Sequence, residues 1–340
     1  QPSVFPSINN LFHFKKDTKP RVGSMVFFSA KLCMLITLLA CVLVTAKNYI
    51  GDNIKCITGF EKQEHKAIET YCFIASTFTI VDLNADVSEA DQRRHAYYQW
   101  VPMVLVLQAV FYYLPIWIWD RIDKGFFQSV LCQLDKIHII EPTDVESSAR
   151  YFVSSMATHR SYGVFFLLCE CSIFAISVGN LFFTNTFLGG EFFKFGPSAI
   201  KYLGTSATDP NNPLNEIFPK VAKCTWHKYG ASGTIQKFDS MCVLPLNIVN
   251  EKTYIFLWLV YIVTAAICGF VLILHLLLFF LSSLRNTVLV HLTHKHQTKQ
   301  DLQNVLLKCN YGDWFLIYHF KSNMAYFSEW VASVKQELQK

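Results

Sequence analysis

Four long apolar runs constrain the fold of this chain more than any other feature of its sequence. They cover residues 24–46, 97–119, 161–183 and 254–283. The first contains one charged side chain and the third contains one, whereas the second and fourth contain none. A helix of roughly 20 apolar residues spans the hydrocarbon core of a bilayer, where lipid offers no partner to a free backbone N–H or C=O. The sequence therefore predicts an all-α membrane protein with four transmembrane helices.

The composition supports this interpretation and argues against a water-soluble protein. Charged residues make up 16% of the chain and hydrophobic residues 52%, whereas soluble domains carry roughly 25% charged residues. The first run is too long for the apolar core of a secretory signal and is not followed by a small-residue cleavage pattern. We therefore expect it to be a retained membrane helix.

Four spans divide the remaining chain into two sets of segments on opposite sides of the membrane. One set comprises residues 1–23, 120–160 and 284–340, and the other comprises residues 47–96 and 184–253. The first set carries 16 Lys and Arg residues and the second carries 13. This difference is too small to fix the orientation by the positive-inside rule.

The cysteines indicate the orientation more clearly. Residues 47–96 contain Cys56 and Cys72, and residues 184–253 contain Cys224 and Cys242, whereas the other set of segments contains only single cysteines. Paired cysteines are typical of an oxidising compartment. We therefore expect residues 47–96 (the first outer loop) and 184–253 (the second outer loop) to be extracellular, and both termini to be cytoplasmic.

The spacing of these four cysteines favours structural disulfides over a metal site. Fifteen residues separate the first pair and 17 the second, unlike the short Cys-x-x-Cys pairs of zinc sites. Four cysteines allow three connectivities, and their spacing does not select one. We expect no metal and no cofactor.

Several segments, in order along nearly the whole chain, carry a recognisable pattern. They are IGDNIKC (50–56), ETYCFIASTFTI (69–80), the hexapeptide YYQWVP, CE (169–170), FLGGEF (187–192), FPKVAKC with the residues that follow it (218–258), and GDWFLIYHF (312–320). The hexapeptide is formed by Tyr97, Tyr98, Gln99, Trp100, Val101 and Pro102, and an interfacial belt of aromatic residues is its plainer interpretation. Together these segments resemble the innexins, the gap-junction proteins of invertebrates, and especially insect members of that family. The hexapeptide is similar to the family's hallmark.

The resemblance implies a plasma-membrane channel of gap junctions that passes ions and small metabolites between adjacent cells. It implies a ring of about eight subunits that docks head to head with a ring in the neighbouring cell. It also implies the disulfides Cys56–Cys242 and Cys72–Cys224. The chain contains no Asn-x-Ser/Thr sequon, so no N-linked glycan would obstruct docking. An undocked hemichannel that releases ions and small metabolites outside the cell is the alternative.

Two groups of residues are candidates for the pore. The resemblance implies that residues 1–23 fold into the pore, with Ile8, Leu11 and Phe12 on an apolar face; a membrane-surface segment is the alternative. Just beyond the first span lie Lys47, Asn48 and Asp52, where related channels narrow. Ordinary solvated polarity at a helix end is the simpler interpretation of these three residues.

The remaining segments give no sign of an enzyme. The chain contains no Walker loop, no Gly-x-Ser-x-Gly elbow and no His-Glu-x-x-His zinc motif. Residues 298–309 and 314–336 carry apolar side chains at helical spacing. We therefore expect a folded helical layer on the cytoplasmic side.

Overall fold

The computed structural model places most of the chain, from residue 22 to residue 340. It describes residues 22–59, 62–75, 77–80, 92–95, 97–124, 126–127, 142–202, 214–230, 232–293, 296–324 and 326–340. Of the pore candidates, Ile8, Leu11 and Phe12 lie outside the described residues, and Asn48 is described only in its helical backbone.

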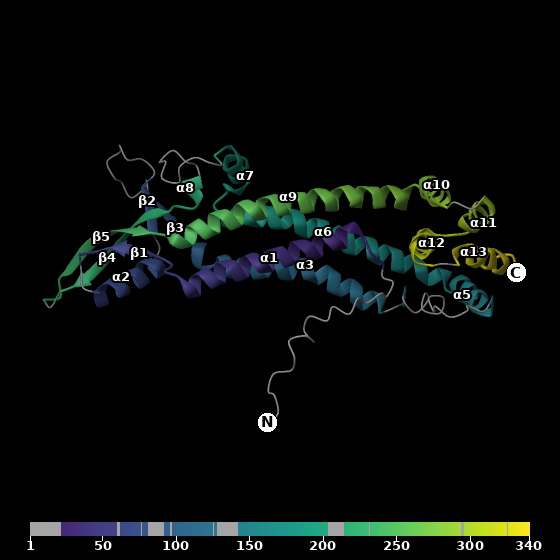
Figure 1. Ribbon diagram of the computed structural model, residues 1–340, viewed down its shortest axis with the longest axis horizontal. Coiled ribbons are helices and arrows are strands. Elements are labelled where there is room, and N and C mark those ends of the chain that lie inside the picture. The colour runs from purple at the N-terminus through teal and green to yellow at the C-terminus, as the bar shows by residue number, and fades with distance from the viewer. Residues whose placement is uncertain are drawn as a thin grey trace, which may run out of the picture. The chain divides into compact units, whose positions relative to one another are not determined.

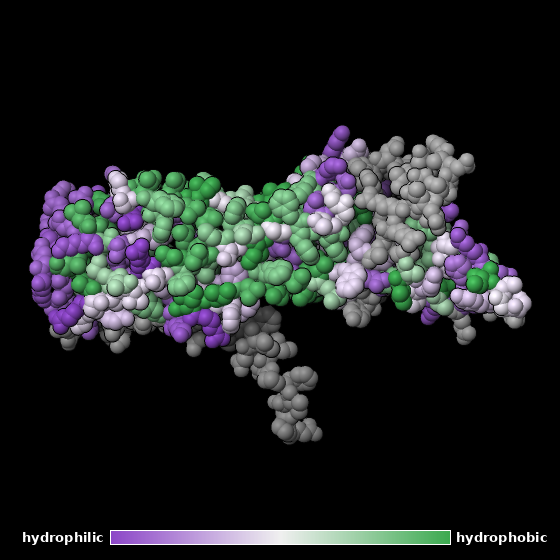
Figure 2. All heavy atoms as spheres, turned by 180° about the vertical axis from the view of Figure 1, so that it is seen from behind, coloured by the Kyte–Doolittle hydropathy of each residue, from purple (hydrophilic) through white to green (hydrophobic). Residues whose placement is uncertain are grey.

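Four helices of the described chain are long and apolar enough to cross a membrane, which confirms the predicted architecture. They are α1 (Met25–Ile50), α3 (Val101–Asp123), α6 (Met156–Phe187) and α9 (Pro245–Phe280), shown in Figure 1. Large apolar side chains are exposed along all four, and Figure 2 shows this apolar surface in green. Lipid is the solvent that such a surface requires.

The chain forms two compact units. The outer unit comprises residues 25–116 and 170–271 and contains both outer loops. The cytoplasmic unit comprises residues 117–169 and 272–340 together with the described residues before Met25. Helices α3, α6 and α9 contribute residues to both units.

A chain of buried side-chain hydrogen bonds connects all four membrane helices within the outer unit. Gln108 of α3 donates to the Thr184 hydroxyl of α6 at 2.7 Å and accepts from the Tyr261 hydroxyl of α9 at 3.0 Å. The Tyr261 oxygen lies 3.5 Å from the Thr37 hydroxyl of α1. All four side chains are fully buried. Polar contacts of this kind hold helices together where lipid supplies no hydrophobic driving force between them.

The outer loops fold into a module of strands and helices, where the sequence predicts only loops joined by disulfides. Its five-stranded sheet has the order β1-β5-β4-β2-β3, with antiparallel neighbours. The strands are β1 (Lys55–Ile57), β2 (Thr77–Ile80), β3 (Gln92–His95), β4 (Val221–Tyr229) and β5 (Ile235–Val243). The helices are α2 (Lys62–Ala75), α7 (Phe192–Lys201) and α8 (Leu214–Ile217), with the 3-10 turn η3 (Tyr97–Gln99) before α3.

The cytoplasmic unit is helical, which confirms the expectation of a helical layer. Besides the inner ends of the membrane helices, it contains α5 (Pro142–Ser154), α10 (Ser282–Leu292), α11 (His296–Leu306), α12 (Tyr311–Asn323) and α13 (Phe327–Glu337). The fully buried Trp330 lies at its centre, with ring centroids 5.1 Å from Phe152 and 5.5 Å from Phe320. Aromatic pairs at such distances stabilise a core beyond the area they bury.

Candidate functional site

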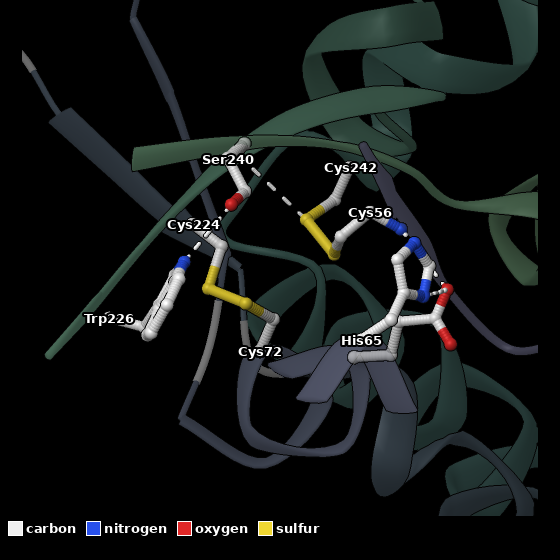
Figure 3. Close-up of a disulfide and its surroundings, with 8 residues drawn as sticks. Cys56, His65, Cys72, Cys224, Trp226, Ser240 and Cys242 are labelled. Atoms are coloured by element: carbon white, nitrogen blue, oxygen red, sulfur yellow. Dashed lines mark hydrogen bonds and ion pairs between the residues drawn. A yellow bond between two sulfur atoms is a disulfide. The ribbon is translucent and has the colours of Figure 1, made fainter. Parts of the chain in front are cut away.

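Two disulfides lie side by side at the centre of the outer module (Figure 3). Cys56 of β1 is bonded to Cys242 of β5, directly opposite in the strand register, and Cys72 of α2 is bonded to Cys224 of β4. Each bond joins the first outer loop to the second, in the pairing that the resemblance implies. The sulfur atoms of Cys56, Cys72 and Cys242 lie within 4.8 Å of one another, but a disulfide sulfur offers no thiolate to a metal.

The alternation of side chains along β4 explains why the disulfides are buried. Ala222, Cys224 and Trp226 point into the module, while their neighbours along the strand are more exposed. Residues alternate between the two faces of a strand, so this spacing directs one cysteine and one large aromatic ring inward. The Trp226 indole donates to the Ser240 hydroxyl at 3.0 Å and stacks on Phe238 with centroids 4.9 Å apart.

Helix α2 is held against the sheet by a carboxylate as well as by a disulfide. Glu69 accepts a hydrogen bond from the backbone N–H of Cys56 at 3.3 Å, and its carboxylate lies 3.4 Å from His65 Nδ1. The contact satisfies a donor of the short strand β1, which is an edge of the sheet. Helix α2 is therefore attached to the sheet at two points: Glu69 contacts β1, and Cys72 is bonded to β4.

The hallmark hexapeptide does more than form an aromatic belt. Tyr97 donates to the carbonyl of Ile217 in the second outer loop at 2.8 Å. Tyr98 is buried and stacks on Phe73 of the first outer loop at 5.3 Å, and Gln99 donates to the Phe73 carbonyl. These three residues therefore anchor both outer loops to the start of α3.

The second half of the hexapeptide begins α3. Trp100 is 57% exposed, as a residue of an interfacial belt would be, whereas Val101 is fully buried. Pro102 lies in the first turn, where a helix does not need its missing N–H. Its carbonyl accepts a hydrogen bond from the Cys41 thiol of α1 at 3.5 Å.

Buried polar side chains at the start of α9 contact the second outer loop, and the hydropathy pattern does not reveal these contacts. The fully buried side chain of Asn247 donates to the Pro219 carbonyl at 2.9 Å. Glu251, which is 1% exposed, forms an ion pair with Lys220 at 3.1 Å. Asn247 and Glu251 contact residues of the outer loop, so polar side chains are accommodated in the first turns of the helix. Helix α9 begins at Pro245, before the apolar run that starts at residue 254.

Two of the pore candidates lie at the outer end of α1. Lys47 is in the last turn of the helix. Asp52 follows the helix and forms an ion pair with Lys55 at 2.8 Å, with both side chains more than half exposed. The hydrogen bond and charge of Lys55 hold the pKa of Asp52 below its usual range. The Asp52 carboxylate is therefore negatively charged at neutral pH.

Comparison with known proteins gives one consistent result. The family model described as "Innexin" matches residues 25–338. The chain is 35% identical over 322 residues to Innexin inx1 of Schistocerca americana, covering 88% of this chain and 87% of that protein. It is 32% identical over 356 residues to Innexin inx2 of the same insect, covering 99% and 98%. It is 34% identical over 323 residues to Innexin inx3 of Drosophila melanogaster, covering 89% and 81%.

Proposed function

The chain belongs to the innexin family of gap-junction channel proteins, and we propose that about eight copies form a ring that docks head to head with a ring in an adjacent cell. The protein is a multi-pass protein of the plasma membrane at gap junctions. Its role is that of a channel subunit that passes ions and small metabolites between cells.

The cross-linked outer module is the observation that supports docking most directly. Two disulfides, a five-stranded sheet and the anchors from Tyr97 to Gln99 combine both outer loops into one body. Docking of two preformed surfaces costs less conformational entropy when the surfaces are rigid before they meet. The absence of an N-linked sequon from the whole sequence also suits an unobstructed docking face.

Tracer transfer between paired cells tests this proposal. We expect a small anionic dye injected into one of two contacting cells that express the chain to enter the second cell, with little dye in the bath. Pairs in which only one cell expresses the chain are the control. Leakage to the bath without transfer would contradict docking and favour the undocked hemichannel. A projection image of the purified assembly gives the subunit number.

For the pore, we propose two regions. Residues 1–23 line its cytoplasmic part, with Ile8, Leu11 and Phe12 on the apolar side. Lys47, Asn48 and Asp52 line its outer part, close to the end of α1. The charged state of Asp52 supports this role, because fixed charges at a constriction select ions by sign.

Reversing the charge of Asp52 tests the outer region. We expect Asp52→Lys to lower the permeability ratio of cations to anions, because one negative charge per subunit becomes positive. Reversal potentials under an ionic gradient measure this ratio. Asp239→Lys is the matched control, since Asp239 is an exposed acid on β5. Equal ratios for the two variants would exclude Asp52 from the conducting path.

A further inference from the structure

A groove lies between α2 and the end of β4 that is nearest the turn between β4 and β5. It has a volume of about 380 Å³ and is lined by Ala67 and Tyr71 of α2 and by Trp226 and Tyr229 of β4. We call it the α2–β4 groove. Strand β4 begins at Val221, next to the start of α9, and a strand rises roughly 3.3 Å per residue, so Tyr229 lies about 26 Å farther along. Figure 1 shows the β4–β5 turn at the end of the outer unit remote from the membrane helices.

Apolar side chains are exposed around this groove, although neither α2 nor β4 is a membrane helix. Tyr229 is 74% exposed, and Ile235, on the other side of the same turn, is 63% exposed. Tyr71, in the wall of the groove, is 45% exposed. A cluster of large apolar groups on a water-facing surface marks a contact with another protein. The groove and the projecting turn are adjacent on one chain.

One acidic and one basic side chain also lie at the groove. Lys228 of β4 and Glu64 of α2 form an ion pair at 3.1 Å, with side chains 40% and 49% exposed. Exposed ion pairs contribute little to stability, because water screens the attraction between the two charges. The pair therefore does little for the fold of its own chain, and either group can exchange its partner for an equivalent group on another molecule.

We propose that the α2–β4 groove receives the β4–β5 turn of a second copy of this chain in the apposed ring. This inference rests on the proposed docking of two rings. Identical docked rings are related by two-fold axes, so each contact surface must be complementary to itself. A groove beside a projecting apolar turn meets this condition, and so do one acidic and one basic group. In the docked pair, Glu64 faces Lys228 of the partner subunit, and Tyr229 and Ile235 enter the partner's groove.

Charge reversal in paired cells tests the contact. Glu64→Lys makes the groove positive and Lys228→Glu makes it negative. We expect the junctional conductance of pairs expressing the same variant to fall by about tenfold or more, because like charges then meet across the junction. A cell with Glu64→Lys paired with a cell with Lys228→Glu should regain conductance to within about threefold of wild type, since both contacts become attractive. Lys223→Glu, on the same strand but nearer the membrane, is the control and should couple normally.

Three outcomes would overturn the proposal. Wild-type conductance in pairs of either single variant would show that the pair is not at the junction. Rescue only when both substitutions are in one chain would mean that the ion pair acts within a subunit. Rescue only when both variants are co-expressed in each cell would place the contact between neighbours in one ring. By contrast, wild-type pairs that fail to couple would refute docking itself. Surface labelling of each variant confirms that the rings reach the membrane.

Discussion

Cells that express the double variant Cys56→Ser/Cys242→Ser are expected to show no electrical coupling, and so are cells that express Cys72→Ser/Cys224→Ser. Each pair of substitutions removes one covalent bond between the two outer loops and leaves no single thiol behind. The hydroxyls that replace the sulfurs are buried, because all four cysteines are at most 2% exposed. We therefore expect the outer module to loosen and the docking surface to lose its shape.

The size of this effect follows from the length of chain that each disulfide closes. The bonded cysteines are 186 and 152 residues apart. Chain-entropy reasoning gives at most about 5 kcal/mol for each such bond. The membrane helices already hold the loop ends near one another, which makes this figure an upper bound. Losing even half of it is a large fraction of the stability of a small folded module.

Dual-cell voltage clamp measures the coupling, and labelling of intact cells measures delivery to the surface. The matched control is Cys171→Ser, which changes a free cysteine of α6 and should leave coupling near wild type. The four membrane helices should still insert in both double variants, because their length and hydropathy are unchanged. Wild-type coupling by either double variant would refute a role of the disulfides in docking.

The membrane architecture was predictable because it depends on local properties of the sequence. A run such as 97–119 needs no knowledge of its neighbours to be recognised as a membrane helix. The grouping of cysteines in two outer loops was likewise readable from their positions. The fourth apolar run begins at residue 254, whereas α9 begins at Pro245. The sequence does not indicate this difference, because Asn247 and Glu251 are polar and the outer loop that buries them becomes known only with the fold.

The strands and the buried polar contacts depend on partners distant in the sequence. The alternation of Ala222, Cys224 and Trp226 was a signal for β4, but the strand β1 has only three residues and gives no such pattern. The roles of Gln108 and Tyr261 needed the fold, because these residues are 153 positions apart. Tyr97 and Gln99 were recognised by resemblance, but their hydrogen bonds to the outer loops could not be inferred from the hexapeptide.

The second large effect is expected in the cytoplasmic unit, where Gly312→Ala should separate α12 from α6. A Cβ atom at residue 312 would lie 1.9 Å from the backbone oxygen of His159 and 2.2 Å from its carbonyl carbon. Neither atom can move without moving the helix. The same helix contact includes a hydrogen bond of 2.8 Å between His159 Nδ1 and the Asp313 carboxylate, both at most 1% exposed. Separating the helices therefore also breaks the hydrogen bond between the buried side chains of His159 and Asp313.

We expect Gly312→Ala to destabilise the cytoplasmic unit by on the order of 3 kcal/mol, from steric overlap and the lost buried contact. Limited proteolysis of the solubilised protein should then cleave within residues 284–340 sooner than in wild type, while the disulfide-bonded outer module stays resistant. Gly179→Ala is the matched control, because a Cβ atom at this position of α6 meets nothing within 4 Å. In Gly179→Ala the added methyl group should even favour the helix slightly. The same cleavage rate in both variants would mean that the close approach of α12 to α6 is not needed to hold this unit together, and that the aromatic core around Trp330 is sufficient.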